Sequence, residues 1–369
     1  MKGTITFVGF GLLASSAAAA LKAGGHSVRI RAVSGEETCR RALEMGLADE
    51  VFGYDAVTQY LPGTDLLLLC SPISHIMDML DVIGNSAYDG HPILISDIGS
   101  TKQEICNRGI SLPSSFRFVG GHPMAGSEKR SLEHHDAALF ENAYWIICPP
   151  QNCPPESYAI LQELIDTLGA HSVTMEASEH DHVMSRLSHV PQLVSTALAS
   201  GLPEGIRAKN QQHLAGRGFR DMTRIAASPW PMWRDILASN QREILAGIEE
   251  MQNSLQGIHD FLQNFQQAQP SLQAVFTEGA EVRASLSSPG KGFTQSLHEL
   301  LVQIPDRPGA ILQVVEPLTK QGINILDIEL AKVREGVGGS LLLGFKLLSD
   351  AEAALHLLTD AGFPTRLRA

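Results

Sequence analysis

Residues 4–21, TITFVGFGLLASSAAAAL, decide the fold of the first half of the chain. The β-branched run at 4–8 predicts a strand, Gly9 and Gly11 predict a tight turn, and the small residues that follow predict a helix packed on the strand. A second strand is expected at 27–32, so the stretch begins a βαβ unit. We therefore expect an α/β fold here and not a secretory signal peptide, although the run is apolar.

The spacing of the glycines indicates a dinucleotide site. Gly9 permits the tight turn, and Gly11 lets the backbone approach a pyrophosphate held at the N-terminus of the helix. Ala14 stands where a third glycine is common. Glycine turns also occur where a helix merely packs on a strand, but this one directly follows the first strand. The residues expected at the cofactor are Gly9, Gly11, Leu12, Leu13, Arg31, Ser34, Ser71 and Pro72.

The end of the second predicted strand bears on the choice of cofactor. NAD-binding folds usually carry an acidic residue there, on the ribose hydroxyl, whereas this chain reads AVS at 32–34. Without that carboxylate a 2′-phosphate is not repelled, and Arg31 and Ser34 could contact one. The pattern slightly favours NADP, or use of either cofactor, while Glu36 and Glu37 leave NAD open.

Further apolar runs predict strands that are buried on both faces of a mostly parallel sheet. They lie at 65–70, 92–96, 116–120 and 145–148, and the first three are followed by polar or small-residue loops. Ligands bind beyond the carboxyl ends of the strands in open α/β sheets. We therefore expect these loops, including the one with His122, to surround the reactive ring of the cofactor.

The composition limits the classes of function. A chain of 369 residues predicts two or three domains. The formal net charge of −12 argues against general binding to nucleic acid or to anionic membranes. The five cysteines include no C-x-x-C pair, and their odd number is typical of reduced thiols in a cytoplasmic protein. No apolar run reaches the ~18 residues expected of a membrane span.

From about residue 177 the pattern changes to long amphipathic helices. Residues 180–202 and 232–265 carry apolar positions at helical spacing, which favours a homodimer interface. Residues 280–296 are rich in Ser, Gly and Pro and predict a linker. The tail beyond it reads strand, helix, strand, hairpin turn, strand, helix, strand. The expected domains are a dinucleotide-binding domain (1–176), an all-α substrate and dimerisation domain (177–285) and a small regulatory domain (296–369).

Five motifs in this order resemble those of the prephenate and arogenate dehydrogenases of tyrosine biosynthesis. They are VGFGLLASS (8–16), SDIGSTK (96–102), GGHPMAGSEK (120–129), EHDHVMSRLSHVPQ (179–192) and GFRDMTRIAASPWPMWRDI (218–236). In the tail, IPDRPGAI (304–311) and GINILDIEL (322–330) resemble the signature of an ACT domain, which implies a ferredoxin-like fold. The resemblance covers essentially the whole chain.

The resemblance implies oxidative decarboxylation of prephenate to 4-hydroxyphenylpyruvate with NAD or NADP. The alternative substrate is arogenate, in which an amino group replaces the side-chain keto group. Hydride leaves the hydroxyl-bearing ring carbon, a base withdraws the hydroxyl proton, and loss of CO2 makes the ring aromatic, so no metal is required. Histidine suits the base because it can take a proton near neutral pH. The resemblance assigns this role to His122 and an orienting role to Ser100.

The two carboxylates of the substrate require cations, and arginine binds a carboxylate through two points. The resemblance matches Arg224 to the ring carboxylate. A zinc site at His180, His182 and His189 is not expected, because these spacings do not make a helical ligand pair. Other residues that the resemblance places at the substrate are His180, His189, Glu128, Lys129, Gln192, Trp233 and Asn240.

The chain departs from the family pattern at two places. Where many relatives read HLPH, this chain reads HVPQ at 189–192, so any role of a second histidine is lost or passes to the amide of Gln192. Residues 130 and 131 are Arg-Ser where relatives often have Ser-Gly. Both changes are expected near the substrate side chain, and they leave the choice between prephenate and arogenate open.

The ACT module implies feedback regulation, with tyrosine as the expected effector. The residues expected to bind it are Asp306, Arg307, Gly309 and Asn324. An alternative from another class is an amino-acid-sensing regulator in which the dinucleotide-binding fold is a passive scaffold. His122, Ser100 and Arg224 together argue against it, since a scaffold needs no base beside a cation.

Overall fold

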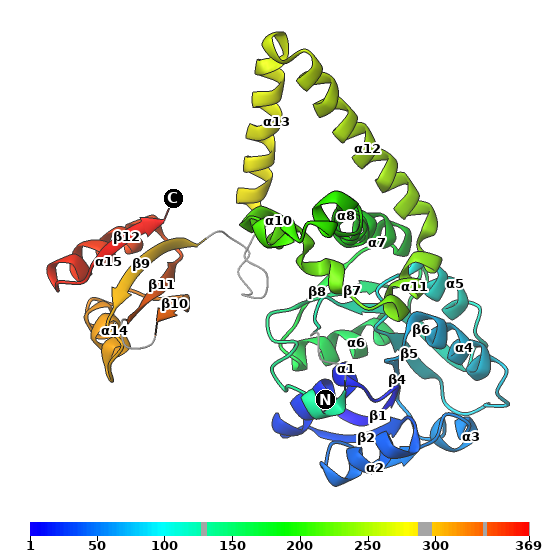
Figure 1. Cartoon of the computed structure of the whole chain (residues 1–369). Coiled ribbons are helices and arrows are strands. Elements are labelled where there is room, and N and C mark those ends of the chain that lie inside the picture. Colours follow the sequence, from blue (N-terminus) through cyan, green and yellow to red (C-terminus); the bar gives the residue numbers. More distant parts are fainter. Residues whose placement is uncertain (127–130, 287–296, 335–337, 369) are drawn as a thin grey trace. The chain divides into compact units, whose positions relative to one another are not determined.

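The computed structural model describes residues 1–126, 131–286, 297–334 and 338–368. The chain forms two compact units, Met1–Asp260 and Phe261–Ala369. The first contains an eight-stranded sheet and a set of helices, and the second contains one long helix and a four-stranded sheet with two helices (Figure 1). No helix in the described part of the chain is long and apolar enough to cross a membrane.

The large sheet has the strand order β3-β2-β1-β4-β5-β6-β7-β8. Neighbouring strands are parallel except β6 and β7, which are antiparallel. This confirms the predicted dinucleotide-binding fold with a mostly parallel sheet. The strands are β1 (Lys2–Val8), β2 (Ser27–Val33), β3 (Glu50–Phe52), β4 (Leu66–Leu69), β5 (Ile93–Asp97), β6 (Phe116–Pro123), β7 (Tyr144–Cys148) and β8 (His171–Thr174).

Helices cover both faces of this sheet, which is why its central strands are apolar throughout. On one face α1 and α6 pack against residues such as Phe7 and Ile147, and on the other α4 and α5 pack against residues such as Leu69 and Phe118. The helices of this part are α1 (Leu12–Ala23), α2 (Glu36–Glu44), α3 (Val57–Tyr60), α4 (Ile73–Gly84), α5 (Gln103–Gly109) and α6 (Pro155–Thr167), with a 3-10 turn η1 at Leu132–His134.

Strand β6 is longer than the predicted strand at 116–120, and it carries His122 within it. The ladder with β7 continues to Pro123, and His122 pairs with Ile146. The expectation that this histidine lies in a loop after the strand is therefore wrong. The antiparallel partner β7 prolongs the pairing, and the residue before a proline favours extended backbone.

The long helices predicted after the sheet are interrupted in the structure, by the π-helix at Ser185–His189 and by breaks at Asn240 and Asn264. The predicted helix at 232–265 breaks at Asn240, where the backbone has φ −128° and ψ 28°. The side chain of Asn240 bonds to other helices instead of continuing the pattern. The elements are α7 (Ala177–Met184), a π-helix η2 (Ser185–His189), α8 (Val190–Ser200), α9 (Glu204–Ala208), η3 (Gln211–Leu214), α10 (Arg217–Thr223), η4 (Arg224–Ala227), α11 (Trp230–Ser239) and α12 (Gln241–Gln263).

Helix α11 is tied to the sheet by side-chain hydrogen bonds. The Asp235 carboxylate accepts the Ser74 hydroxyl at 2.6 Å and the Ser74 N–H at 3.2 Å, at the start of α4. The buried hydroxyls of Thr101 and Ser239 are 2.8 Å apart. These contacts hold α11 against the carboxyl ends of β4 and β5.

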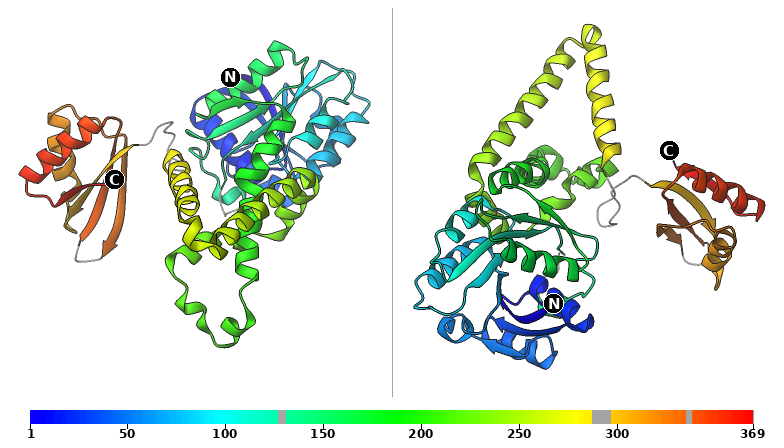
Figure 2. Two further views of the ribbon diagram at one scale, coloured as in Figure 1. Left: turned by 90° about the horizontal axis from the view of Figure 1, so that it is seen from above. Right: turned by 180° about the vertical axis from the view of Figure 1, so that it is seen from behind.

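The second unit contains helix α13 (Phe265–Ser285) and the small sheet, which has the order β10-β11-β9-β12 with antiparallel neighbours. Helices α14 and α15 share one core with this sheet (Figure 2). This confirms the predicted ferredoxin-like module. Because α13 runs to Ser285, residues 280–285 are helical and not linker, and 287–296 lie outside the described residues. The elements are β9 (His298–Ile304), α14 (Ala310–Lys320), β10 (Asp327–Arg334), β11 (Gly338–Phe345), α15 (Leu348–Asp360) and β12 (Thr365–Arg368).

Candidate active site

The turn between β1 and α1 accepts only glycine at residue 9. Gly9 has φ +91°, and a Cβ atom there would lie 2.2 Å from the Ser71 hydroxyl and 2.8 Å from the Cys70 carbonyl. Its N–H donates to the Val33 carbonyl at 2.8 Å. The glycine thus brings the carboxyl ends of β1, β2 and β4 together.

The N-terminus of α1 follows directly and is open to an anion. Gly11 is the N-cap residue, no side chain caps the helix, and its first turn contains no acidic residue. The first-turn N–H groups, which include those of Leu12 and Leu13, have no carbonyl partner within the helix. Such a terminus attracts negative charge. The residues present therefore fit the pyrophosphate of a dinucleotide.

Arg31 and Ser34 stand at the other side of the expected cofactor site. The Arg31 Nε donates to Glu50 at 2.8 Å and its Nη1 donates to the Pro62 carbonyl at 2.8 Å, and the side chain is only 12% exposed. The geometry thus directs this guanidinium to partners inside the domain. Ser34 is buried just after the end of β2, and Pro72 is the N-cap residue of α4.

Three buried side chains form a hydrogen-bonded chain that ends on His122. The His122 Nδ1 and His180 Nε2 are 2.8 Å apart, and the His180 Nδ1 and Asp181 Oδ1 are also 2.8 Å apart. The same carboxylate accepts the backbone N–H groups of Lys102 at 2.7 Å and Gln103 at 2.9 Å. His122 is 9% exposed, and His180 and Asp181 are at most 1% exposed. These hydrogen bonds link β6 to α7 and to the start of α5.

His189 joins the same region through the π-helix. A π-helix places an extra residue in the helical turn and is often found at functional sites. The side chain of His189 is 1% exposed, its Nδ1 lies 3.3 Å from Asn240 Nδ2, and its ring meets that of Trp233 edge-on at 6.0 Å. Asn240 Nδ2 also donates to the Asp181 carbonyl at 2.8 Å. The structure therefore brings together His122, His180, His189, Asn240 and Trp233.

A fully buried ion pair, which the sequence analysis did not single out, lies next to these histidines. Lys102 and Asp97 form a salt bridge and are both 0% exposed. Asp97 also accepts the N–H groups of Gly99 at 2.8 Å and Gly121 at 3.1 Å. The available signal was a pair of opposite charges five residues apart, flanking a glycine directly after a buried strand. The sequence analysis also did not single out Asp181, which is adjacent to His180 in the sequence.

Burial keeps the histidines of this region neutral. It lowers the pKa of His122 well below its usual range, and the nearby His180 and Lys102 act in the same direction. Burial also lowers the pKa of His180, although its bond to Asp181 opposes the shift. The pKa of His189 falls to about 4, again chiefly through burial. At neutral pH the three imidazoles are therefore neutral, and each has one ring nitrogen without a hydrogen.

Arg224 lies on a turn that Gln192 holds in place. The Gln192 Nε2 donates to the Ile225 carbonyl at 2.8 Å, and its Oε1 accepts the Ser228 hydroxyl at 3.2 Å. Gln192 is 5% exposed, whereas Arg224 is exposed and has no ion pair with any residue of the described ranges. The amide at 192 therefore fixes η4, and the guanidinium of Arg224 is left for a ligand.

Three other predicted residues are less well defined by the structure. Ser100 follows β5 and is half-buried, and within the described part of the chain no hydrogen bond joins it to His122. Its neighbour Thr101 instead bonds to Ser239. Glu128 and Lys129 lie outside the described residues.

The small module has a hollow of its own, with a volume of ≈ 210 Å³. Asp306, Arg307 and Gly309 line it, and Gly309, with φ +84°, precedes the first residue of α14. Asn324 is exposed and does not line this hollow. Three of the four residues expected to bind an effector thus lie together.

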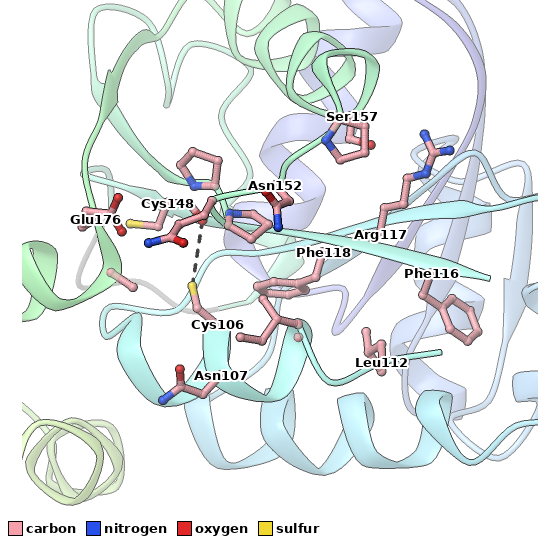
Figure 3. A pocket seen from close by; sticks show the side chains of 17 residues that line it. Cys106, Asn107, Leu112, Phe116, Arg117, Phe118, Cys148, Asn152, Ser157 and Glu176 are labelled. Carbon is pink, nitrogen blue, oxygen red and sulfur yellow. Dashed lines mark hydrogen bonds between the residues drawn. The ribbon is translucent and has the colours of Figure 1, made fainter. Parts of the chain in front are cut away.

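A larger groove of ≈ 660 Å³ lies in the first unit (Figure 3), and its lining includes none of His122, His180 and His189. Cys106 and Cys148 lie toward one end and Arg117 toward the other, beside α5 and β6. Burial raises the pKa of both thiols, that of Cys148 to about 12. Because protonated thiols are poor nucleophiles and neither His122 nor Gly9 lines the groove, it is not the candidate active site.

Comparison with known proteins agrees with this geometry. Residues 17–174 match the prephenate dehydrogenase nucleotide-binding domain, 176–278 the prephenate dehydrogenase dimerization domain and 298–352 the ACT domain. The chain is 33% identical to a prephenate dehydrogenase of Bacillus subtilis, over 96% of this chain and 95% of that protein.

Two solved structures share the fold of about three quarters of the chain. Synechocystis arogenate dehydrogenase is 28% identical with a TM-score of 0.65, and covers 76% of this chain and 98% of its own. Prephenate dehydrogenase from Aquifex aeolicus, solved with hydroxyphenyl propionate and NAD+, is 25% identical with a TM-score of 0.67 and the same coverage. The chain belongs to the prephenate dehydrogenase family of oxidoreductases and carries a C-terminal ACT domain.

Proposed function

We propose that the protein is a prephenate dehydrogenase that converts prephenate to 4-hydroxyphenylpyruvate and CO2. The observation that carries this proposal is the neutral, buried imidazole of His122, held through one ring nitrogen on a strand whose sheet also bears the anion-binding turn at Gly9. A proton acceptor on the same sheet as a dinucleotide-binding turn suits removal of a proton and a hydride from one alcohol. The B. subtilis relative, similar over almost its full length, supports the choice of substrate.

NAD is the cofactor that we propose. When bound it accepts the hydride from the hydroxyl-bearing carbon of the substrate. The backbone at Gly11 and the open first turn of α1 would hold its pyrophosphate. Support for NAD over NADP comes from Arg31, which is engaged with Glu50, and from the NAD+ complex of the A. aeolicus relative.

His122 and Arg224 divide the remaining work. The His122 ring takes the proton of the substrate hydroxyl, and after CO2 has left it can return this proton to the ring oxygen, so that the protein ends unchanged. Arg224 binds a substrate carboxylate through paired N–H donors. Gln192 positions Arg224 by fixing the turn at Ile225 and Ser228. Trp233 and His189, whose rings meet edge-on, would contact the substrate beside His122.

Arogenate dehydrogenase activity is the second candidate. It is favoured by the similarity to the Synechocystis enzyme and by Gln192, since an amide stands where many relatives have a histidine. The two substrates differ only in the side chain, at a keto or an amino group. The chemistry proposed for His122 is the same for both.

A four-way assay tests the function. Purified protein is mixed with prephenate or arogenate and with NAD or NADP, and reduction is followed at the nicotinamide absorbance. We expect the fastest reduction with prephenate and NAD. Faster turnover of arogenate would select the second candidate, and faster turnover with NADP would reverse the cofactor assignment. No reduction in any of the four mixtures would refute the proposed function.

We further propose that tyrosine binds the hollow at Asp306, Arg307 and Gly309 and inhibits the enzyme, and that the chain acts as a homodimer. The hollow offers the cation of Arg307 for an amino-acid carboxylate, and the match to a dimerization domain supports the dimer. Millimolar tyrosine should lower the rate of the wild type and have less effect on Arg307→Ala. Equal inhibition of the two proteins would exclude this hollow as the effector site.

A further inference from the structure

The hydrogen-bonded chain that ends on His122 also determines where its ring proton lies. The chain begins at Asp181, whose two carboxylate oxygens accept the backbone N–H groups of Lys102 and Gln103. A backbone N–H can only donate, so both oxygens act as acceptors, as in an ionised carboxylate. The nitrogen that lies 2.8 Å from Asp181, Nδ1 of His180, must therefore carry a hydrogen.

This assignment passes along the chain to His122. A neutral imidazole with a hydrogen on Nδ1 has an unprotonated Nε2, which accepts hydrogen bonds. The Nε2 of His180 lies 2.8 Å from Nδ1 of His122, and a bond between two ring nitrogens needs one hydrogen. His122 must supply it, so its own hydrogen is on Nδ1 and its Nε2 has a free lone pair.

We propose that His180 and Asp181 are positioning residues that hold His122 in the tautomer with an unprotonated Nε2 and stabilise the imidazolium formed when this atom takes the substrate proton. The inference rests on the proposed function of His122 as the base. In that step the substrate O–H bond breaks and an Nε2–H bond forms. The positive charge on His122 then faces His180, which donates to the negative carboxylate of Asp181.

The surroundings explain why the base needs this support. Lys102 lies nearby as a buried cation, paired with Asp97, and disfavours a second positive charge on His122. His189, from the π-helix, acts in the same direction. Asp181, reached through His180, is the negative group that opposes them. It is itself held by the first N–H groups of α5 and is 1% exposed, so it cannot turn away to water.

Two substitutions at His180 separate positioning from simple packing. His180→Leu removes the acceptor for Nδ1 of His122, whereas the amide oxygen of His180→Gln can occupy the place of Nε2 and still accept that hydrogen. We expect kcat of the Leu variant to fall on the order of 10- to 100-fold, as for the partners that orient metal-bound histidines, with KM nearly unchanged. The Gln variant should recover part of this loss.

The tautomer can be observed directly by nitrogen NMR of the histidine rings. In the wild type, the signals that disappear in His122→Asn should show a hydrogen on Nδ1 and none on Nε2. In His180→Leu, the ring of His122 should change tautomer or become a mixture. A hydrogen on Nε2 in the wild type, or full kcat in His180→Leu, would overturn the proposal. The wild-type tautomer, assigned with His122→Asn, decides the point even if His180→Leu does not fold.

Failure of this proposal can be told apart from failure of the proposed function. If the four-way assay shows no turnover but the Nδ1–H tautomer is found, the positioning role of His180 and Asp181 is supported and the proposed function is wrong. If prephenate is oxidised but the tautomer is reversed, the reaction holds and the positioning is wrong.

Discussion

The buried chain from Asp181 to His122 and the exposed turn with Arg224 are built in opposite ways. Both ring nitrogens of His180 and both carboxylate oxygens of Asp181 have a hydrogen-bond partner, at 2.7 to 2.9 Å. Arg224, by contrast, is exposed and has no ion pair in the described ranges, although its turn is fixed by Gln192. The hydrogen-bond partners of the proton acceptor are thus already in place, whereas the arginine proposed to bind the substrate carboxylate is unpaired among the described residues.

The difference follows from what each group must do. A base works best in one tautomer and one orientation, which requires partners that are present before the substrate arrives. A cation that is already paired would first have to lose its partner, which weakens binding. Variants of the two regions should therefore affect different kinetic constants.

The largest effect is expected for His122→Asn. Asparagine can still bond to His180 but cannot take a proton, so kcat should fall by about 10²- to 10⁴-fold, the usual contribution of general base catalysis. Titration with NAD, followed by fluorescence, should show unchanged cofactor affinity. A variant that keeps its turnover would show that the buried chain is only structural.

A smaller effect, on a different constant, is expected for Arg224→Ala. Loss of hydrogen bonds to a charged group costs about 1.5 to 3 kcal/mol, or roughly 10- to 150-fold in kcat/KM, and we expect most of it in KM. Arg224→Lys should lie between, because lysine keeps the charge but not the paired donors. Arg217→Ala removes another exposed arginine and serves as the control. An equal loss of kcat/KM in Arg217→Ala would mean that only the overall positive charge matters and not a specific contact of Arg224.

The smallest effect is on stability as the pH falls. His189 has a native pKa of about 4, below the usual value of 6.5, so the unfolded chain binds its proton first. The contribution of neutral His189 to the free energy of unfolding is fully present above about pH 6.5. It is lost as the pH falls toward 4, by at most about 1.4 kcal/mol per pH unit. Urea unfolding at several pH values gives the free energy of unfolding as a function of pH. This free energy should depend less steeply on pH in His189→Gln than in the wild type. Identical slopes would mean that His189 titrates normally in the native protein.

The fold was largely predictable because it depends on local patterns. Apolar runs, glycine turns and helical periodicity are properties of short segments, and they predicted the parallel sheet and the small module correctly. The errors lie where distant segments interact. The extension of β6 through His122 depends on pairing with β7, and the helix break at Asn240 depends on bonds to Asp181 and His189.

The candidate site was predictable only as a set of residue types. The motifs brought His122, His180 and His189 to attention, but sequence alone cannot show which nitrogen meets which atom. Asp181 and the pair Asp97–Lys102 were missed because a charge adjacent to a motif usually lies in solvent. Only the fold reveals that these three are 0 to 1% exposed.

The π-helix at Ser185–His189 has a consequence for insertions and deletions. A π-turn holds one residue more than an α-turn, so the removal of one residue from this segment would make the helix regular and keep the orientation of α8. His189 lies in this turn, with its ring against Trp233 and 3.3 Å from Asn240. We therefore expect the deletion to displace the ring of His189 while the bond from Gln192 to the Ile225 carbonyl persists.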